Sequence, residues 1–249
     1  EQTMLMERLA AHANYFESKM PWLNEYKKNI IHPPIAKVIN VITETGGTGP
    51  ISPIGINLPN EQAIRQQFGS KSILLRNVTE AYEQSSGKDL LYEFAWDDDE
   101  IENQVKYGMK ADNLHTALHE VIGHGSGKVN NNLIGDPANY LPGYYNTLEE
   151  ARADLVALWC VFDSKILETG IANDFQELRK IGETMFQQAV RVALTQLRRI
   201  GEEDQLQEDH MKNRQLIAHY LMENFRAVRK TTKNGKTYQK HSIRSKKMT

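Results

Sequence analysis

From Asp97 onward, apolar residues recur at the spacing of amphipathic helices. Four acids at positions 97–100 stand at the first of these segments, where the helix dipole favours negative charge. Residues 113–124 carry apolar side chains on one helical face, namely Leu114, Leu118, Val121 and Ile122. The same periodicity predicts helices over residues 147–168, 175–200 and 210–226. Between them, residues 125–146 are rich in Gly, Asn and Pro and predict irregular structure.

The N-terminal third mixes helical and extended patterns. Its first thirty residues predict a helix that breaks near Pro21. Three short segments predict strands, residues 37–42, 51–58 and 72–75. The second of these contains Pro53 and so suits a sheet edge, and Asn60 suits the N-cap of a short helix through Gln67. We therefore expect an α+β fold that is predominantly α-helical, with a small sheet in the N-terminal third.

Composition narrows the class of protein. The chain has 249 residues, of which 40% are hydrophobic, so it can bury a sizeable core, and we expect residues 1–249 to form a single domain. Residues 226–249 hold nine Lys or Arg and no acid, and predict a basic hairpin and tail. The net charge of −2 nevertheless argues against a general nucleic-acid binder. No apolar run approaches the roughly 20 residues that span a membrane, and we expect a cytoplasmic protein. The oligomeric state stays open.

The chain contains one cysteine, Cys160, within the apolar stretch of residues 157–162. Its surroundings predict a small buried side chain. A single cysteine excludes a disulfide within the chain and gives no indication of an oxidising compartment. Any zinc ion in this protein must therefore be held by His and carboxylate side chains.

Two histidines bracket a glutamate in the segment His119-Glu-Val-Ile-Gly-His124. The commoner zinc signature places its two histidines four residues apart, on one helical face. A separation of five residues overshoots that face by about 140° in a regular helix, so the imidazoles would not meet at one ion. We therefore expect a one-residue π-bulge between Glu120 and His124, or local unwinding at Gly123.

Acidic residues cluster in Glu149-Glu-Ala-Arg-Ala-Asp154, at the start of the next predicted helix. Catalytic zinc commonly takes two His, one Glu and a water molecule, and Glu150 can supply the carboxylate. A zinc-bound His usually donates its other N–H to a carboxylate, which Glu149 and Asp154 can provide. Arg152 can hold a neighbouring carboxylate in place, and Glu120 can take a proton from the water.

Each part of this pattern also has a purely structural interpretation. The segment Thr147-Leu-Glu-Glu150 fits a capping box at the start of an ordinary solvated helix. A lone buried histidine is usually a hydrogen-bonded core residue. The histidine pair together with the acids downstream favours a metal site over these two structural interpretations.

These residues resemble the dipeptidyl peptidase III family of zinc metallopeptidases, in particular the zinc-bearing catalytic lobe of a bacterial member. The segments His119-Glu-x-x-Gly-His124-Gly-Ser-Gly-Lys128 and Glu149-Glu-x-Arg-Ala-Asp154 look like the two signatures of that family. Residues 55–60 are similar to its substrate-contacting strand, and residues 209–214 to its downstream catalytic-histidine segment.

The resemblance implies one Zn²⁺ ion, an oligopeptide substrate and release of dipeptides from the substrate's N-terminus. It also implies a role for each matching residue. These roles are zinc ligation by His119, His124 and Glu150, catalysis by Glu120 and His210, orientation of the zinc-binding histidines by Glu149 and Asp154, and substrate binding by Gly55, Asn57, Asn60 and Arg214.

Members of that family are longer and have two lobes around a cleft. Since the sequence begins at Glu1 within a predicted helix, we expect a fragment of a longer two-lobed peptidase. Three functions stay open: release of dipeptides, a zinc-stabilised module that binds peptides without cleaving them, and another zincin-type aminopeptidase. We expect neither nucleic acid nor a membrane as a partner.

Overall fold

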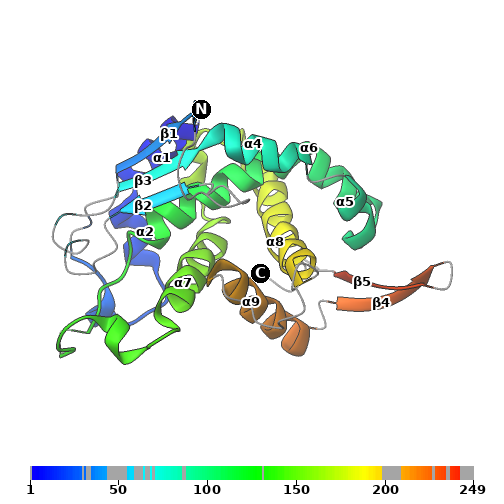
Figure 1. Cartoon of the computed structure of the whole chain (residues 1–249). Coiled ribbons are helices and arrows are strands. Elements are labelled where there is room, and N and C mark those ends of the chain that lie inside the picture. The colour runs from blue at the N-terminus through cyan, green and yellow to red at the C-terminus, as the bar shows by residue number, and fades with distance from the viewer. Residues whose placement is uncertain are drawn as a thin grey trace.

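The computed structural model describes residues 2–29, 31, 35–43, 55–58, 64, 68, 71–85, 88–130, 132–197, 209–225, 228–233 and 236–241. Helices dominate this part of the chain (Figure 1). The α-helices are α1 (Gln2–Ala11), α2 (Ala13–Lys19), α4 (Arg76–Ser85), α5 (Lys88–Phe94), α6 (Asp98–Ala117), α7 (Tyr145–Cys160), α8 (Phe175–Leu197) and α9 (Asp209–Phe225). Short 3-10 helices are η1 (Asn24–Tyr26), η3 (Pro137–Tyr140) and η4 (Ser164–Thr169), and a π-helical segment is η2 (Leu118–Gly123).

A three-stranded sheet lies in the N-terminal third, so the predicted α+β, predominantly helical fold is confirmed. Its strand order is β1-β3-β2, with β1 (Ile35–Ile39) parallel to β3 (Lys71–Leu75) and β2 (Gly55–Leu58) antiparallel to it. Within this described sheet β2 is an edge strand, as its sequence predicted. The basic segment contains a second, two-stranded sheet of β4 (Val228–Lys233) and β5 (Lys236–His241), which projects to the right in Figure 1.

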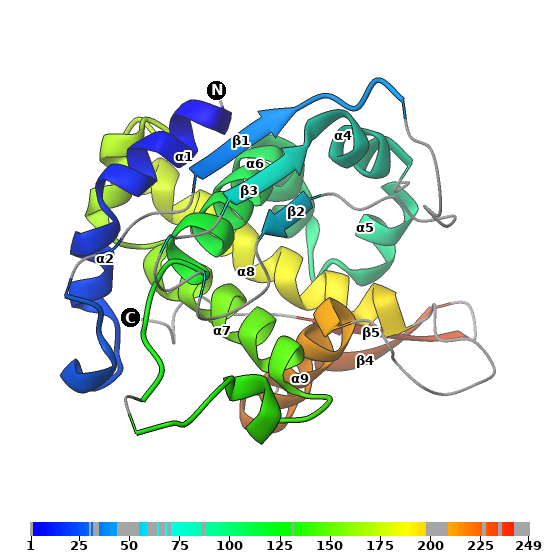
Figure 2. The same cartoon turned by 60° about the vertical axis from the view of Figure 1, so that its left-hand side comes forward.

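The hydrophobic core surrounds η2, where the sequence predicted chemistry. Helices α1, α2 and α7 pack against η2, and α9 lies below α7 in Figure 2. Helix α8 packs against α6 and α9. The largest fully buried side chains include Phe16 of α2, Leu114 of α6, Leu118 and Ile122 of η2, and Met185 of α8. Burying a side chain of this size contributes about 1.5–3 kcal/mol, so the core holds η2 rigidly between its neighbours.

The start of α6 explains why the run of acids begins a helix. Asp97 is the N-cap, and its side chain accepts a hydrogen bond from Glu100 N at 3.0 Å. The Glu100 carboxylate reaches back and accepts one from Trp96 N at 2.9 Å. These reciprocal bonds satisfy two backbone donors at the helix start.

Two features differ from the sequence predictions. The predicted strand over residues 37–42 lies at Ile35–Ile39, because the side chain of Asn77 pairs with both N and O of Val41 at 2.9 Å and takes it out of the sheet. Helices α4 and α5 were not predicted. The predicted N-cap Asn60 lies outside the described residues.

The predicted helix over residues 147–168 is two segments, and its predicted capping box is wrong. Helix α7 begins at Tyr145 and ends at Cys160, and Asp163 then accepts a hydrogen bond from Lys165 N at 2.8 Å to start η4. Thr147 lies inside α7, and its hydroxyl donates to Asp209 Oδ1 of α9 at 2.6 Å. A contact between distant helices thus replaces the local cap. Among the described residues, no helix is long and apolar enough to cross a membrane.

Candidate metal centre

The π-helical segment η2 resolves the spacing of the two histidines. His124 N donates to His119 O at 3.0 Å, a bond that spans five residues. One extra residue in this turn compensates for the overshoot, and the two imidazole centroids lie 4.8 Å apart. The predicted π-bulge is therefore confirmed, and it starts earlier than expected, at Leu118.

Gly123 allows η2 to approach α7 closely. A Cβ atom at this position would lie 2.8 Å from Cα and 3.0 Å from the carbonyl oxygen of Ala153. The first distance is shorter than real Cβ contacts, and the second is tighter than most of them. A glycine is thus required for the two histidines to meet the acids of α7.

Three side chains converge on one point from η2 and α7. His119 Nε2 lies 3.1 Å and His124 Nε2 lies 3.7 Å from Glu150 Oε2. The ligand atoms of these three residues all lie within 4.8 Å of one another. A tetrahedral ion with bonds of 2.0–2.1 Å places its ligand atoms about 3.4 Å apart, which the two measured distances bracket.

Glu150 Oε2 also marks the place where a cation fits. It is buried, and no hydrogen bond of good geometry reaches it from the described residues, although imidazole nitrogens of His119, His210 and His124 lie 3.1, 3.3 and 3.7 Å away. A buried carboxylate oxygen without a hydrogen bond is costly unless a cation compensates for it. The two His and one Glu are therefore arranged so that they could hold a metal ion.

A carboxylate stands behind each imidazole. Asp154 Oδ1 lies 2.7 Å from His119 Nδ1, and Glu149 Oε1 lies 3.0 Å from His124 Nδ1. When Nδ1 carries the hydrogen and donates it to the carboxylate, the Nε2 lone pair is left for a metal ion. Arg152 holds Glu149 with two parallel bonds of 2.6 and 2.9 Å.

The pKa values show that this buried cluster attracts positive charge. Burial alone would lower the pKa of His119, but Asp154 and Glu150 hold it well above its ordinary range. Burial would raise the pKa of Asp154, yet His119 keeps that pKa well below its usual value. Burial opposes ionisation of Glu149 as well, but His124 and Arg152 lower its pKa. The acids thus stay ionised and favour a cation between them.

Glu17 of α2 holds the loop that follows the second histidine, and the sequence analysis did not find it. Its carboxylate is buried and accepts hydrogen bonds from Gly127 N at 3.0 Å and from Lys28 N at 2.6 Å. Lys28 Nζ in turn donates to Gly125 O at 2.6 Å. Nothing in the sequence around Glu17 distinguishes it from an exposed glutamate on an ordinary helix, so its burial could not be predicted.

The remaining predicted residues lie at different distances from this point. Glu120 is half-buried beside His119, and its charge helps to raise the pKa of that histidine. His210, at the start of α9, lies with Nδ1 3.3 Å from Glu150 Oε2. Arg214 is near enough for its charge to lower the pKa of Asp154.

Of the predicted substrate-binding residues, Gly55 and Asn57 lie in the edge strand β2, paired with Leu74 and Ser72 of β3. Asn60 lies outside the described residues. The structure therefore brings the three candidate metal ligands together with His210 and Arg214, and it gives only a backbone position for two of the predicted substrate-binding residues.

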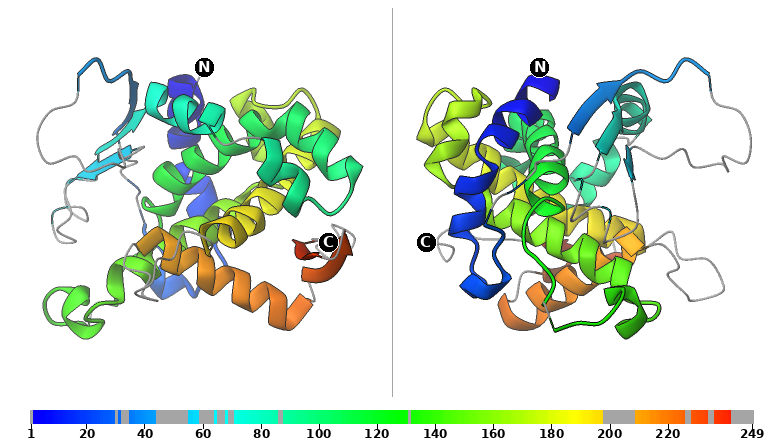
Figure 3. Two further views of the ribbon diagram at one scale, coloured as in Figure 1. Left: turned by 45° about the vertical axis from the view of Figure 1, so that its right-hand side comes forward. Right: turned by 90° about the vertical axis from the view of Figure 1, so that its left-hand side faces the viewer.

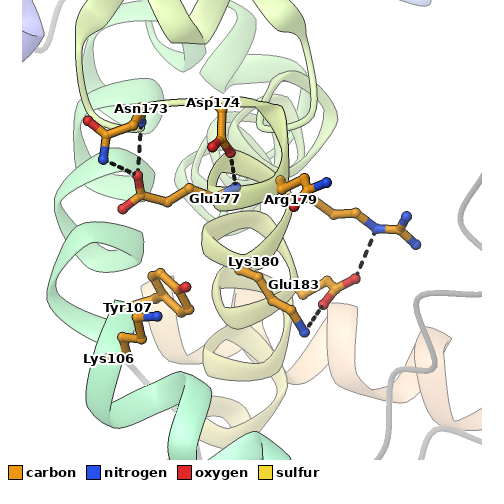
Figure 4. A pocket seen from close by; sticks show the side chains of 9 residues that line it. Lys106, Tyr107, Asn173, Asp174, Glu177, Arg179, Lys180 and Glu183 are labelled. Carbon is orange, nitrogen blue, oxygen red and sulfur yellow. Dashed lines mark hydrogen bonds and ion pairs between the residues drawn. The ribbon is translucent and has the colours of Figure 1, made fainter.

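A hollow of about 900 Å3 lies away from this centre, between α6 and the start of α8 (Figure 4). Its charged side chains pair with one another: Glu183 contacts Arg179 at 3.1 Å and Lys180 at 3.5 Å. Glu177 accepts a hydrogen bond from Asn173 at 2.7 Å. These groups pair with one another, and the lining of the hollow contains no histidine, so it lacks the convergence of imidazoles and carboxylates seen at the candidate metal centre.

The fold and the site together define a predominantly helical domain in which two His and one Glu meet at one point, a ligand set that suits a catalytic metal ion. The sequence profile of Peptidase family M49 matches residues 1–143, more than half of the chain. The chain therefore belongs to Peptidase family M49, and the predicted resemblance to dipeptidyl peptidase III proteins is confirmed.

Several known proteins are similar to this chain. Dipeptidyl peptidase 3 of Dictyostelium discoideum is 30% identical over 200 residues, which cover 68% of this chain and 27% of that protein. Dipeptidyl peptidase 3 of Homo sapiens is 29% identical over 123 residues, which cover 49% of this chain and 16% of that protein. The solved structure of DPP III from Caldithrix abyssi has the same fold, with a TM-score of 0.72 at 21% identity, over 99% of this chain and 44% of that one. This chain thus spans less than half the length of these relatives.

Proposed function

We propose that this chain is the zinc-binding catalytic part of an exopeptidase that releases dipeptides from the N-terminus of oligopeptides. The observation that carries the proposal is the approach of His119 Nε2 and His124 Nε2 to Glu150 Oε2, at 3.1 and 3.7 Å, in a chain of a peptidase family. The names of its relatives support the dipeptidyl specificity.

The donor set favours zinc. Two imidazole nitrogens and one carboxylate are the ligands of many catalytic zinc sites, which leave a fourth position for water. A zinc ion held there supplies a Lewis acid that polarises a carbonyl and makes a bound water acidic near neutral pH. Asp154 and Glu149 support the proposal because they hold the Nδ1 side of each imidazole.

The protein's own groups would move the proton and orient the peptide. Glu120 would accept a proton from the attacking water and donate it to the leaving amine. His210, whose Nδ1 is 3.3 Å from Glu150 Oε2, would donate a hydrogen bond to the carbonyl oxygen as it gains charge. Arg214 would contact the peptide near this point.

The open edge of β2 supports binding of an extended peptide. Within the described sheet, β2 pairs with β3 on one side only, which leaves backbone groups of Gly55 and Asn57 for an added strand. Backbone pairing reads the direction of a peptide rather than its side chains, so we expect tolerance of many sequences. Asn60 would lie near the amino end of the bound peptide.

Replacement of Glu120 by Gln tests the proposal. E120Q should lose about 100- to 10,000-fold in turnover of a dipeptidyl-arylamide, because the amide cannot accept the proton, while zinc content stays at one ion per chain. E102Q is the matched control, since Glu102 is exposed on α6, and it should keep its activity. Wild-type turnover by E120Q would contradict the assignment.

A second function, zinc-dependent peptide binding without cleavage, is favoured by the share of the relatives that this chain covers, 27% of the Dictyostelium protein. Titration of a peptide with and without zinc, followed by mass analysis of the products, separates the alternatives. Dipeptides indicate the first function, single amino acids an aminopeptidase, and an intact bound peptide the second. The single domain over residues 1–249 and the cytoplasmic location stay predictions.

A further inference from the structure

Helix α9 is joined to the metal-binding helix α7 by three polar contacts along one face. Figure 3 shows α9 crossing beside α7 and α8, and it packs against both. The contacts are Thr147 Oγ1 to Asp209 Oδ1 at 2.6 Å, His210 Nδ1 to Glu150 Oε2 at 3.3 Å, and Asn213 Nδ2 to Asp154 Oδ2 at 2.5 Å. Asn213 has no role in the function proposed above.

The two oxygens of the Asp154 carboxylate have different partners. Asn213 Nδ2 donates to Oδ2, while Oδ1 faces His119 Nδ1 at 2.7 Å. His115 Nε2 also lies 3.4 Å from Oδ1 and competes for the same oxygen. The bond from Asn213 therefore fixes the rotation of a carboxylate that has two imidazoles to choose from.

The other half of the Asn213 amide has no compensating bond. The residue is fully buried, and its Oδ1 receives no hydrogen bond from the described residues. An unsatisfied buried acceptor costs about 1–3 kcal/mol, which a leucine of similar size would avoid. Turning the amide over would bring Oδ1 against the Asp154 carboxylate, where two acceptors repel. The bond to Asp154 is thus the interaction that accounts for an asparagine at this position.

We propose that Asn213 is a positioning residue of the metal centre, which acts on His119 through Asp154. Without it the Asp154 carboxylate can turn toward His115, and His119 Nε2 is no longer held toward the ion. Loss of the carboxylate that orients a ligating His typically weakens metal binding about 10- to 100-fold, so loss of the residue that holds that carboxylate should cost no more than this. The inference rests on the zinc site of the proposed function.

A double-mutant cycle on the whole chain tests this path. The zinc dissociation constant is measured by competition with a chromophoric chelator for wild type, N213L, D154A and N213L/D154A. N213L should bind zinc about 10-fold more weakly than wild type, but should cost nothing further once Asp154 is gone. An equal loss in both backgrounds, or no loss in wild type, overturns the proposal. A wild-type chain that binds no zinc refutes the proposed function instead.

Two further variants separate positioning from packing. N224A is the matched control, because Asn224 is exposed on the same helix and its side chain donates to Tyr220 O, within that helix, at 2.9 Å. This change should leave zinc affinity unchanged. If N213L loses its native circular dichroism, N213S replaces it in the same cycle. The loss of zinc affinity in N213S must then again depend on the presence of Asp154. The visible spectrum of the Co²⁺-loaded chain should change in N213L and not in N224A.

Discussion

The two ends of the long helix α6 both meet buried charged groups, but only one of the groups is internally complete. At its start, Glu100 accepts from Arg191 of α8 at 2.8 Å and from Trp96 N at 2.9 Å, and Arg191 also donates to Gln104. At its end, His119 leads into the cluster in which Glu150 Oε2 keeps no hydrogen bond from the described residues.

The difference separates a structural pair from a binding site. Buried charges that satisfy one another hold two helices together and leave nothing for a ligand. Buried lone pairs that converge without hydrogen bonds to one another favour a cation at their centre. The first three changes below test this distinction, and the fourth concerns a buried thiol outside both groups.

Removal of Glu150 should have the largest effect. E150A leaves two imidazoles without the carboxylate. Zinc affinity should therefore fall by more than about 100-fold, the upper loss expected when only a hydrogen-bond partner of a ligand is removed. Chelator competition measures the loss, with E102A as the control on an exposed glutamate. Zinc binding equal to wild type would exclude Glu150 as a ligand.

Breaking the complete pair should cost stability and spare the metal. R191M leaves Glu100 buried without its cation, and we expect a loss of about 3–5 kcal/mol in the free energy of unfolding. R179M is the matched control, because Arg179 forms an exposed pair with Glu183 and should cost less than about 1 kcal/mol. Urea unfolding measures both. If the folded R191M chain binds zinc more weakly, the two ends of α6 are not independent.

G123A should disturb both stability and metal binding. The added Cβ meets the backbone of Ala153, which cannot yield as a side chain can, so we expect a loss of about 1–3 kcal/mol and weaker zinc binding. In G108A the new Cβ meets only the flexible side chains of Gln104 and Gln188, so the losses of stability and of zinc affinity should be smaller. Thermal unfolding and chelator competition on both variants decide, and a G123A chain that matches G108A would show that close approach is not required.

The smallest effect concerns Cys160, at the end of α7, a buried thiol that belongs to neither group. Burial raises its pKa to about 12. Because the thiol in the unfolded chain ionises near pH 8.5, its contribution to stability is complete below that pH and is lost as pH rises toward 12. At pH 9 the loss should be about 0.8 kcal/mol relative to C160A, whose curve lacks this component. Parallel curves for the two chains in urea would show that the thiol is not shielded.

Short-range patterns predicted much of the molecule. The five-residue step from His119 to His124 was sufficient to predict a π-bulge, since helical geometry alone decides where two imidazoles point. The acids at 97–100 predicted the start of α6, because the helix dipole favours negative charge there. The burial of Cys160 also followed from its apolar neighbours.

Long-range contacts are what the sequence did not reveal. Thr147 looked like a helix cap, but its partner Asp209 lies 62 positions away. Asn213 gave no signal because its buried bond exists only once α9 packs on α7. Strand β1 ends early because Asn77, from a helix that was not predicted, binds Val41. In each case the decisive partner belongs to an element whose packing the periodicity does not encode.

The position of the metal ion tests the central claim most directly. A crystal of the zinc-loaded chain, measured on both sides of the zinc absorption edge, should show one anomalous peak about 2.0–2.2 Å from His119 Nε2, His124 Nε2 and a Glu150 oxygen. A zinc peak elsewhere in the molecule, with these three side chains unliganded, would contradict the account.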